Sequence, residues 1–413
     1  MRKPPTLPPP TISPIHQPKD TDVTEVRTYK LITPLFGGGV EPGVVDSELT
    51  PIRGTAIRGH LRFWWRATRG WQYEALKDLK EAEDLIWGAA STEEKPRPSL
   101  VRIQVEGLER KNEVEFVTYR QRKNGQREQV SISDINSPLG YVAFPLRDMP
   151  NSKAIAGIQF QLTLTFPSDY KPDVEAALWA WETFGGIGAR TRRGFGALCR
   201  TDIALSHINQ VSLNLHENLK KYVQPATKWP QDVPHLSLDS TFYKITGAQK
   251  DPIDAWGLLV LKLKSFRQSR HSERGRSKWP EPDAIRGLTE NHSKYHPPQR
   301  PIIEKFPRAV FGLPIIFQFK DEHKGDPSKT TLEGKHHNRL ASPLIIRPIA
   351  CLSNQAVGIA LILETPQIPP DGLVLKTTGK PHHVDAELTH TQAHSIAPLN
   401  GNPEVLKKFL ESI

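Results

Sequence analysis

Residues 51–70 contain five arginines and no acidic residue. On a helix, Arg58, Arg62 and Arg66 share one face, with Trp65 beside them. The planar guanidinium group suits phosphate oxygens and base stacking better than a lysine does. An exposed helix face normally carries glutamates four residues away from its basic side chains, and this one carries none. The segment, which also includes Arg53, therefore favours contact with RNA or DNA over an ordinary solvated face.

Residues 185–196, with the sequence GGIGARTRRGFG, combine open backbone with positive charge. Bare amide N–H groups can bind phosphates while side chains clamp the strand. A dinucleotide-binding loop opens a helix after a strand, whereas this loop should end a helix and precede a strand. A merely tight turn, the alternative, needs one or two glycines rather than five. The predicted contacts are Gly185, Gly186, Gly188, Arg190, Arg192, Arg193, Gly194 and Phe195.

A third basic stretch spans residues 261–287. Its first eighteen positions hold seven Lys or Arg and one acidic residue. Two aromatic residues, Phe266 and Trp279, are interleaved with the basic residues of the whole stretch. Alternating charge and aromatic rings are typical of proteins that bind single-stranded nucleic acid. We predict contacts from Arg267 and Arg286, and a solvated basic loop is the alternative.

The sequence offers little catalytic chemistry. It has no nucleophile elbow and no HExxH motif, and nothing pairs His60 or His292 with a second acid–base group. His383, Glu387, His390 and His394 have a spacing that would gather them around one metal only if they were helical. We expect no catalytic residue, metal or cofactor.

The elements that position these residues form an alternating pattern. A strand is predicted at 23–33, a helix capped by Thr55 at 55–68, and an alternating strand at 157–166. A helix starting at Pro172 and ending at Gly185 is followed by a strand at 197–203, which completes a split β-α-β unit of the ferredoxin-like type. Downstream, we expect a helix at 255–266, strands at 311–319, 343–350 and 357–364, and a last helix from Asn402.

The 413 residues carry a net charge of +10 and include 37 prolines and two cysteines. We expect a proline-rich disordered arm at 1–22, an N-terminal domain at 23–205, a linker at 206–240 and a C-terminal domain with a basic insertion at 241–413. The fold class is α+β, with two ferredoxin-like domains packed together. No apolar stretch is long enough to cross a bilayer, and the first residues lack a secretory signal. A reducing cytoplasm is therefore the expected location, and the charge fits a polyanionic partner.

Five stretches resemble the RAMP superfamily of CRISPR systems and, within it, the first-subunit family of the type III-B Cmr effector complex. They are ITPLFGGGVEPG at 32–43, IRGTAIRGHLRFWWRAT at 52–68, FGGIGARTRRGFGAL at 184–198, SKWPEPDAIR at 277–286, and FGLPI with RLASPLIIRP at 311–315 and 339–348. The resemblance implies two RNA-recognition-motif-like domains in a non-catalytic subunit. Such a subunit contacts the 3′ region of the guide RNA, other Cmr subunits and target RNA in antiviral defence.

Two alternative functions fit the sequence less well, an endoribonuclease and a DNA-binding regulator. A metal-independent RAMP endoribonuclease that processes CRISPR repeat RNA would need an acid–base pair beside the glycine-rich loop, and residues 184–203 contain no histidine. A regulator of double-stranded DNA would need a helix-turn-helix or zinc-finger signature, and none is present.

Overall fold

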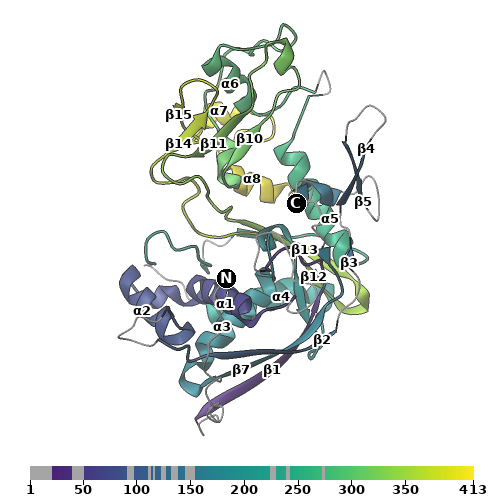
Figure 1. Cartoon of the computed structure of the whole chain (residues 1–413), viewed down its shortest axis with the longest axis vertical. Helices are drawn as coiled ribbons and strands as arrows, with labels where there is room; N and C mark the ends of the chain where they lie inside the picture. Colours follow the sequence, from purple (N-terminus) through teal and green to yellow (C-terminus); the bar gives the residue numbers. More distant parts are fainter. Residues whose placement is uncertain are drawn as a thin grey trace, which may run out of the picture.

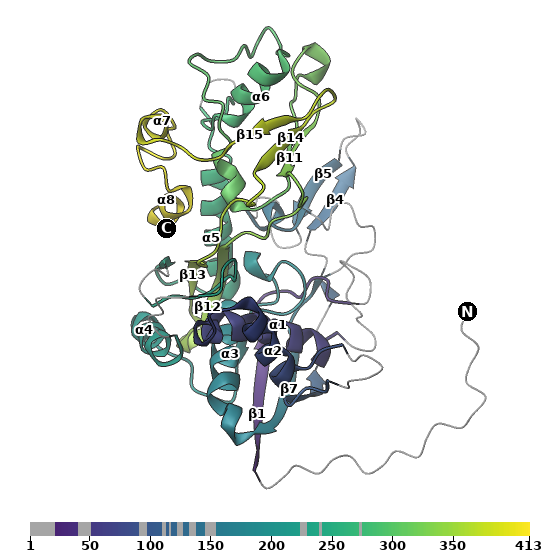
Figure 2. The same cartoon turned by 90° about the vertical axis from the view of Figure 1, so that its left-hand side faces the viewer.

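The computed structural model describes residues 21–39, 51–90, 97–109, 113–114, 117–121, 127–131, 138–144, 154–223, 229–238, 242–271 and 275–413. The predicted arm at 1–22 lies outside this part of the chain except for its last two residues. The molecule is elongated. One sheet lies at each end of the long axis, and a third sheet lies between them beside a long helix (Figures 1 and 2).

The first sheet contains β1 (Asp22–Leu31), β2 (Arg102–Glu109), β7 (Gln159–Pro167) and β8 (Leu198–Arg200), in the antiparallel order β2-β7-β1-β8. In β7 the apolar residues alternate strictly with glutamine and threonine, and the apolar ones are all buried. A strand of period two has one core face and one polar face, so this alternation fixes the register of the sheet. The predicted strand at 157–166 is confirmed.

Helices α1 (Gly54–Arg69) and α3 (Lys171–Phe184) pack together on the core face of this sheet. The α1 stripe of Ile57, Leu61, Trp64 and Thr68 is buried as predicted. The predicted cap is wrong, because Arg53 rather than Thr55 holds the N-cap position and no side chain caps the helix. Helix α3 has a proline in its first turn and ends at Gly185.

Two further helices flank this layer. Helix α2 (Leu76–Trp87) follows α1, and α4 (Val211–Tyr222) lies inside the interval predicted as a linker. Helix α4 buries Leu215 and Leu219 in the same core as α3. The interval 206–240 therefore contains a packed helix, which its mixed polarity concealed.

The central sheet has the antiparallel order β12-β13-β9, with β9 (Phe242–Ile245), β12 (Leu344–Ala350) and β13 (Ala356–Ile362). Helices α5 (Pro252–Arg267) and α8 (Val405–Glu411) share its core. Pro252 at the start of α5 and the side chain of Asp251, which accepts from the Asp254 amide, define that helix start. The helix and strands predicted here are confirmed.

The third sheet has the order β10-β11-β14-β15 and its own small core. Its strands are β10 (Ile315–Phe317), β11 (Thr330–Gly334), β14 (Leu373–Lys376) and β15 (His382–Val384), accompanied by α6 (Glu281–Thr289) and α7 (His390–His394). The strand predicted at 311–319 is present only as β10, because a 3-10 turn occupies Pro307–Phe311. The other three strands were not predicted, because they are only three to five residues long.

Short strands complete the described part of the chain. These are β3 (Glu113–Val114) with β6 (Ala154–Ile155), and the hairpin β4 (Val117–Gln121) with β5 (Arg127–Ser131). The α+β class is confirmed. Among the described helices, none has the length and apolar character that a bilayer crossing requires.

Candidate nucleic-acid interface

Two of the predicted arginines on α1 are held by an acid from α2. Arg62 Nε lies 2.6 Å and Arg66 Nη1 lies 2.5 Å from the same carboxylate oxygen of Glu83. Glu83 is 4% exposed, so this is a partly desolvated ion pair rather than a surface contact. The glutamates missing at i±4 are replaced by one that lies 17 and 21 residues away in sequence.

Trp65 is fully buried, and its indole Nε1 donates a 2.9 Å hydrogen bond to Asp173 of α3. Arg69 Nε approaches the same carboxylate oxygen at 3.2 Å. The structure thus uses Trp65 to join α1 to α3, and its predicted contact with a base remains a prediction.

The two arginines at the start of α1 differ from Arg62 and Arg66 in their surroundings. Arg53 donates from Nη2 to the carbonyl oxygens of Gly38 and Gly39, at 2.6 and 3.0 Å, while its Nε is buried without a partner. Arg58 also has a buried Nε without a partner, and burial together with Arg62 lowers the pKa of its guanidinium. Within the described chain, no acidic side chain pairs with either residue. No acidic side chain of the described residues therefore offsets their charges.

The glycine-rich loop, residues 185–196, packs tightly against the rest of the protein. A Cβ on Gly196 would lie 1.9 Å from the Ile187 carbonyl oxygen, and one on Gly194 would lie 2.4 Å from Trp256 Nε1. Both residues have φ in the left-handed region, at +60° and +88°. Gly185, Gly186 and Gly188 would likewise bring a Cβ within 2.5–2.8 Å of another atom. Glycine is therefore required here by close packing, whatever else the loop contacts.

Arg192 and Arg193 turn from the loop toward the central sheet. Arg192 Nη1 donates to the Ser342 carbonyl oxygen at 2.5 Å, and Arg193 Nη1 donates to that of Leu344 at 2.7 Å. The Arg193 carbonyl in turn accepts a 2.6 Å hydrogen bond from Trp256 Nε1. Burial lowers the pKa of Arg193 to about 9, and repulsion from Arg267 and other arginines adds to the shift. The glycine-rich loop therefore connects the first-sheet region to the central-sheet region.

Phe195 lies inside that connection. It is fully buried, and its ring contacts Trp256 edge-on at 4.9 Å and Phe36 at 5.8 Å between centroids. The predicted contact of Phe195 with RNA is not tested by this placement, but the ring already has aromatic partners on two sides.

Arg190 and Arg267 form the clearest unpaired charge of the candidate interface. Burial lowers the pKa of Arg190, and the nearby Arg267 lowers it further. The Nε atoms of both are buried without hydrogen-bond partners, and no acidic side chain of the described residues forms an ion pair with either. Arg190 has the strained φ of +59°, and its guanidinium lies 4.8 Å from the ring of Phe144. The chain thus holds two like charges together at the edge of the glycine-rich loop.

Arg286 is placed elsewhere, in the third-sheet region. It forms a two-point pair with Asp326, at 3.1 and 3.2 Å, and also contacts Asp283, which in turn binds Arg276. Arg286 is 6% exposed. Most of the motif around it, WPEPDAIR, therefore holds α6 in place, and Arg286 lies outside the group formed by Arg190 and Arg267.

Part of the chain matches a known family. Residues 28–199, which contain most of the first sheet and the glycine-rich loop, match the RAMP superfamily. This region is RAMP-like, and the chain resembles a Cmr1 subunit. Its sequence is 23% identical to the CRISPR system Cmr subunit Cmr1-1 of Pyrococcus furiosus over 283 residues, which cover 66% of this chain and 72% of that protein.

Solved structures similar to this chain include two Cmr proteins. The crystal structure of Cmr1 from Pyrococcus furiosus in its apo form shares 18% identity, with a TM-score of 0.47 over 84% of this chain and 90% of the other. A chain of the type III-B Cmr-beta complex bound to cognate target RNA shares 14% identity, with a TM-score of 0.48 over 95% and 100%.

The histidine cluster that a helical segment would have formed is absent from the described residues. His383 lies on β15, whereas His390 and His394 lie on α7, which begins only after Thr389 caps it. The residues between are not helical, so these side chains do not share one helix face. Within the described residues, the group with metal-ligand proximity is a different one: His296, Asp321 and Asp326.

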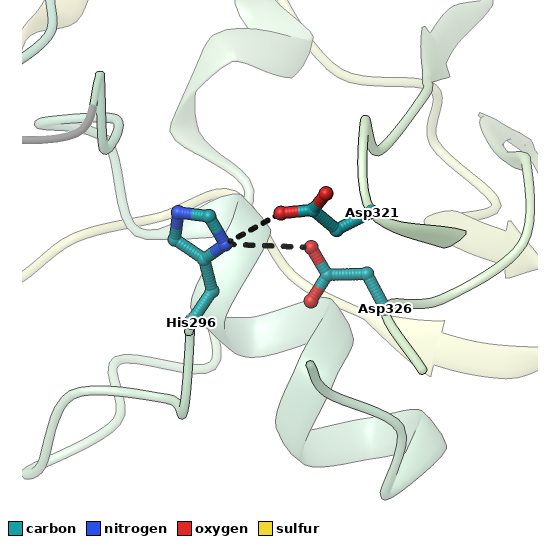
Figure 3. A group of neighbouring side chains, drawn as sticks. All are labelled: His296, Asp321 and Asp326. Atoms are coloured by element: carbon teal, nitrogen blue, oxygen red, sulfur yellow. Dashed lines mark ion pairs between the residues drawn. The ribbon is translucent and has the colours of Figure 1, made fainter. Parts of the chain in front are cut away.

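Figure 3 shows this group, with His296 Nδ1 3.5 Å from Asp321 and 3.8 Å from Asp326. Both carboxylates already have cationic partners, Lys324 for Asp321 and Arg286 for Asp326. Burial alone would raise the pKa of Asp326, but hydrogen bonds from Arg286 and the Ser293 amide bring it below its usual value. The group fastens the loop after α6, which contains His296, to the loop between β10 and β11, which contains Asp321 and Asp326.

Arg347, on β12, was not among the residues predicted from the sequence. It is 1% exposed and donates to the carbonyl oxygens of Glu182, Gly185 and Leu198 at 2.7–2.8 Å. Burial lowers its pKa to about 10. The available signal was an arginine inside the otherwise apolar strand LIIRPIA.

Proposed function

We propose that this chain is a non-catalytic RNA-binding subunit of a type III-B CRISPR effector complex. In this proposal it contacts the 3′ region of the guide RNA, helps to engage target RNA and serves antiviral defence. Its other partners are the remaining Cmr subunits, and it needs no cofactor.

The observation that carries the proposal is the uncompensated charge of Arg190 and Arg267. Two buried or half-buried guanidinium groups repel each other there, and no acidic side chain of the described residues offsets them. Desolvated like charges are costly unless a partner neutralises them. A phosphate between them would supply both the missing charge and the missing hydrogen-bond acceptors. Arg53 and Arg58 extend the same positive charge to the start of α1.

We further infer that the chain contains two ferredoxin-like domains. The order β2-β7-β1-β8, with α1 after the first strand and α3 after the third, supports this for the first sheet. The order β12-β13-β9, with α5 after β9, supports a similar arrangement that lacks the fourth strand. The third sheet would then be an insertion on both sides of β12 and β13.

The predicted RNA contacts divide into two groups by their surroundings. We propose that Arg53, Arg58, Arg190 and Arg267 touch RNA, with Arg192 beside them. Trp65, Phe195 and Arg286 are buried, Arg193 is partly buried, and all four contact protein atoms, so we propose that they support the interface. Arg62 and Arg66 would have to leave Glu83 in order to bind a phosphate.

The match to the RAMP superfamily supports a place in a Cmr complex. The similar chain from Cmr-beta was solved in an assembly bound to target RNA, and we propose the same class of partner here. Sequence selection would come from guide–target base pairing, and this subunit would recognise the backbone. Both cysteines are free, which is consistent with the reducing cytoplasm we propose as its location.

RNA binding by the purified full chain tests the proposal. Fluorescence anisotropy with a labelled 20-nucleotide RNA should give an affinity that falls as salt rises, because bound phosphates release counterions. Replacing Arg58, Arg190 and Arg267 together by glutamine should weaken binding at least tenfold and flatten the salt dependence. A matched variant that removes three exposed lysines, Lys77, Lys335 and Lys380, controls for net charge.

Equal affinities of the arginine and lysine variants would contradict the proposed interface. To test the absence of cleavage, the protein is incubated with labelled CRISPR repeat RNA, with and without a chelator. We expect intact RNA in both samples. A discrete product that persists with the chelator would favour the endoribonuclease instead.

A further inference from the structure

Phe144 is an exposed aromatic ring at the edge of the candidate interface. It follows a short 3-10 turn at Pro138–Tyr141, and this turn packs against α5. Phe144 is 49% exposed, although its neighbours Val142 and Ala143 are buried. The buried neighbours fix the backbone, so the ring projects from a held position and not from a free loop.

Arg190 covers part of this ring. Its guanidinium carbon lies 4.8 Å from the centroid of Phe144, within the range of a cation–π contact. The backbone of Arg190 is strained, with φ at +59°, and a non-glycine residue holds that conformation only where its surroundings enforce it. The guanidinium is therefore presented to the ring by the turn of the glycine-rich loop, and the uncovered part of the ring faces solvent.

Two positively charged side chains, Arg190 and Arg267, gather at the ring of Phe144. Arg267, at the end of α5, is close enough to Arg190 to disfavour its charged form, and Tyr141 is close enough to favour it. The Nε atoms of both arginines are buried and lack partners. The guanidinium of Arg267 also lies over the ring of Phe311, at 5.1 Å. An aromatic surface and two cations that have no acidic partner among the described residues are thus gathered from three separate segments of the chain.

We propose that Phe144 is a stacking platform for one unpaired base of an RNA single strand, whose adjoining phosphate lies between Arg190 and Arg267. This inference rests on the proposed function and adds the form of RNA that the site takes. A base has an apolar face that stacks on an exposed ring, and an adjacent backbone phosphate then meets the arginines. In a duplex the base faces are covered by their neighbours, so a duplex offers phosphates but no free face.

Binding measurements on the full chain separate the ring from the charges. Phe144→Leu keeps an apolar side chain and removes the aromatic face, and it should weaken binding of an unstructured RNA roughly fivefold to tenfold. Its salt dependence should stay unchanged, because no charge is lost. Arg267→Gln should instead reduce the slope of log affinity against log salt by about 0.7, the value for one phosphate contact with a single strand. Phe144→Trp should retain binding.

Phe242 provides a matched control. It is 42% exposed, and Lys407 lies 4.3 Å from its ring centroid, so it is a second exposed ring beside a cation, away from the glycine-rich loop. Phe242→Leu should leave RNA affinity unchanged. Thermal unfolding of both leucine variants checks that each remains folded.

A direct probe of stacking is RNA that carries 2-aminopurine at successive positions. Wild-type protein should quench or shift the fluorescence at one position, and Phe144→Leu should abolish that change while a blunt RNA duplex of equal length binds both proteins equally. If the wild type binds RNA but Phe144→Leu changes neither affinity nor fluorescence, the platform is wrong and the RNA-binding function stands. If the wild type binds neither form of RNA, the proposed function itself is wrong.

Discussion

The Arg347 guanidinium donates a 2.7 Å hydrogen bond to the carbonyl oxygen of Gly185, the first residue of the glycine-rich loop. The same Nη1 binds the Glu182 carbonyl near the end of α3, and Nη2 binds that of Leu198 at the start of β8. One side chain from the central sheet thus satisfies carbonyl groups on both sides of the loop. The terminal carbonyls of a helix need such partners, and here they come from the other half of the protein.

Replacing Arg347 by methionine should lower the free energy of unfolding by at least about 3 kcal/mol, because several buried carbonyl oxygens lose their donors. Arg347→Lys keeps the charge but loses the planar fork, so its free energy of unfolding should lie between those of the wild type and of Arg347→Met. Urea unfolding followed by tryptophan fluorescence measures both. Arg102→Met is the control: it breaks the exposed pair with Asp22 and should cost less than about 1 kcal/mol. A loss of similar size at both positions would argue against the role of Arg347.

Glu83 should contribute to stability and not to RNA binding. Glu83→Gln removes the carboxylate that Arg62 and Arg66 share. Arg66 then loses its acidic partner, whereas Arg62 keeps the longer contact with Asp84, and the change should cost about 3 kcal/mol. The RNA affinity should stay equal or rise, because both arginines lose the Glu83 carboxylate. Thermal unfolding and RNA anisotropy on the same sample test both parts. Weaker RNA binding by a folded Glu83→Gln protein would show that the pair positions the interface.

How much could be predicted depended on the distance over which each interaction acts. The alternation in β7 and the apolar stripe of α1 are local, and they gave the first layer correctly. The same local reasoning gave Arg62 and Arg66 no acidic partner, since Glu83 comes from another helix. The glycine count of the loop also had a tertiary cause, as Gly196 faces the Ile187 carbonyl oxygen.

The third sheet and Arg347 show a different limit. Strands of three to five residues carry too few alternations to be distinguished from loops, and their pairing with distant segments decides whether they form. Arg347 did stand out as a charge in an apolar strand, but nothing nearby in sequence marks its acceptors, which lie more than 140 residues away. The arginine-rich chemistry was visible in the sequence, but the separation of bound from unpaired arginines was not.

His60 should make stability depend on pH. Burial lowers the pKa of this histidine to about 4, whereas an unfolded histidine titrates near 6.5. Between these values the unfolded state binds more protons than the folded state, so the free energy of unfolding falls as pH falls from about 6.5 toward 4. At pH 5 the contribution amounts to about 2 kcal/mol. Other acidic groups also titrate below pH 5, so the comparison with a variant isolates this one.

Unfolding free energies at pH 7.5 and pH 5.0 test this for the wild type and for His60→Gln, which cannot be protonated. The variant should lose less stability between the two pH values than the wild type. If the two proteins lose the same amount, His60 is not the group responsible, and the acid sensitivity arises from other side chains.

Gly196 should tolerate no side chain. A Cβ there would lie 1.9 Å from the Ile187 carbonyl oxygen, and the Gly196 carbonyl itself accepts from the Ile187 amide. Gly196→Ala must therefore separate two hydrogen-bonded segments of the loop as well as hold alanine at φ +60°. Gly107→Ala provides the control, since Gly107 has nearly the same φ, +61°, and no atom within 4 Å of its Cβ position. The strain of the left-handed conformation alone costs about 1–2 kcal/mol, so Gly107→Ala should lose that amount in urea unfolding and Gly196→Ala should lose at least twice as much. Equal losses would mean that the loop yields easily, and the close packing inferred within the glycine-rich loop would then be wrong.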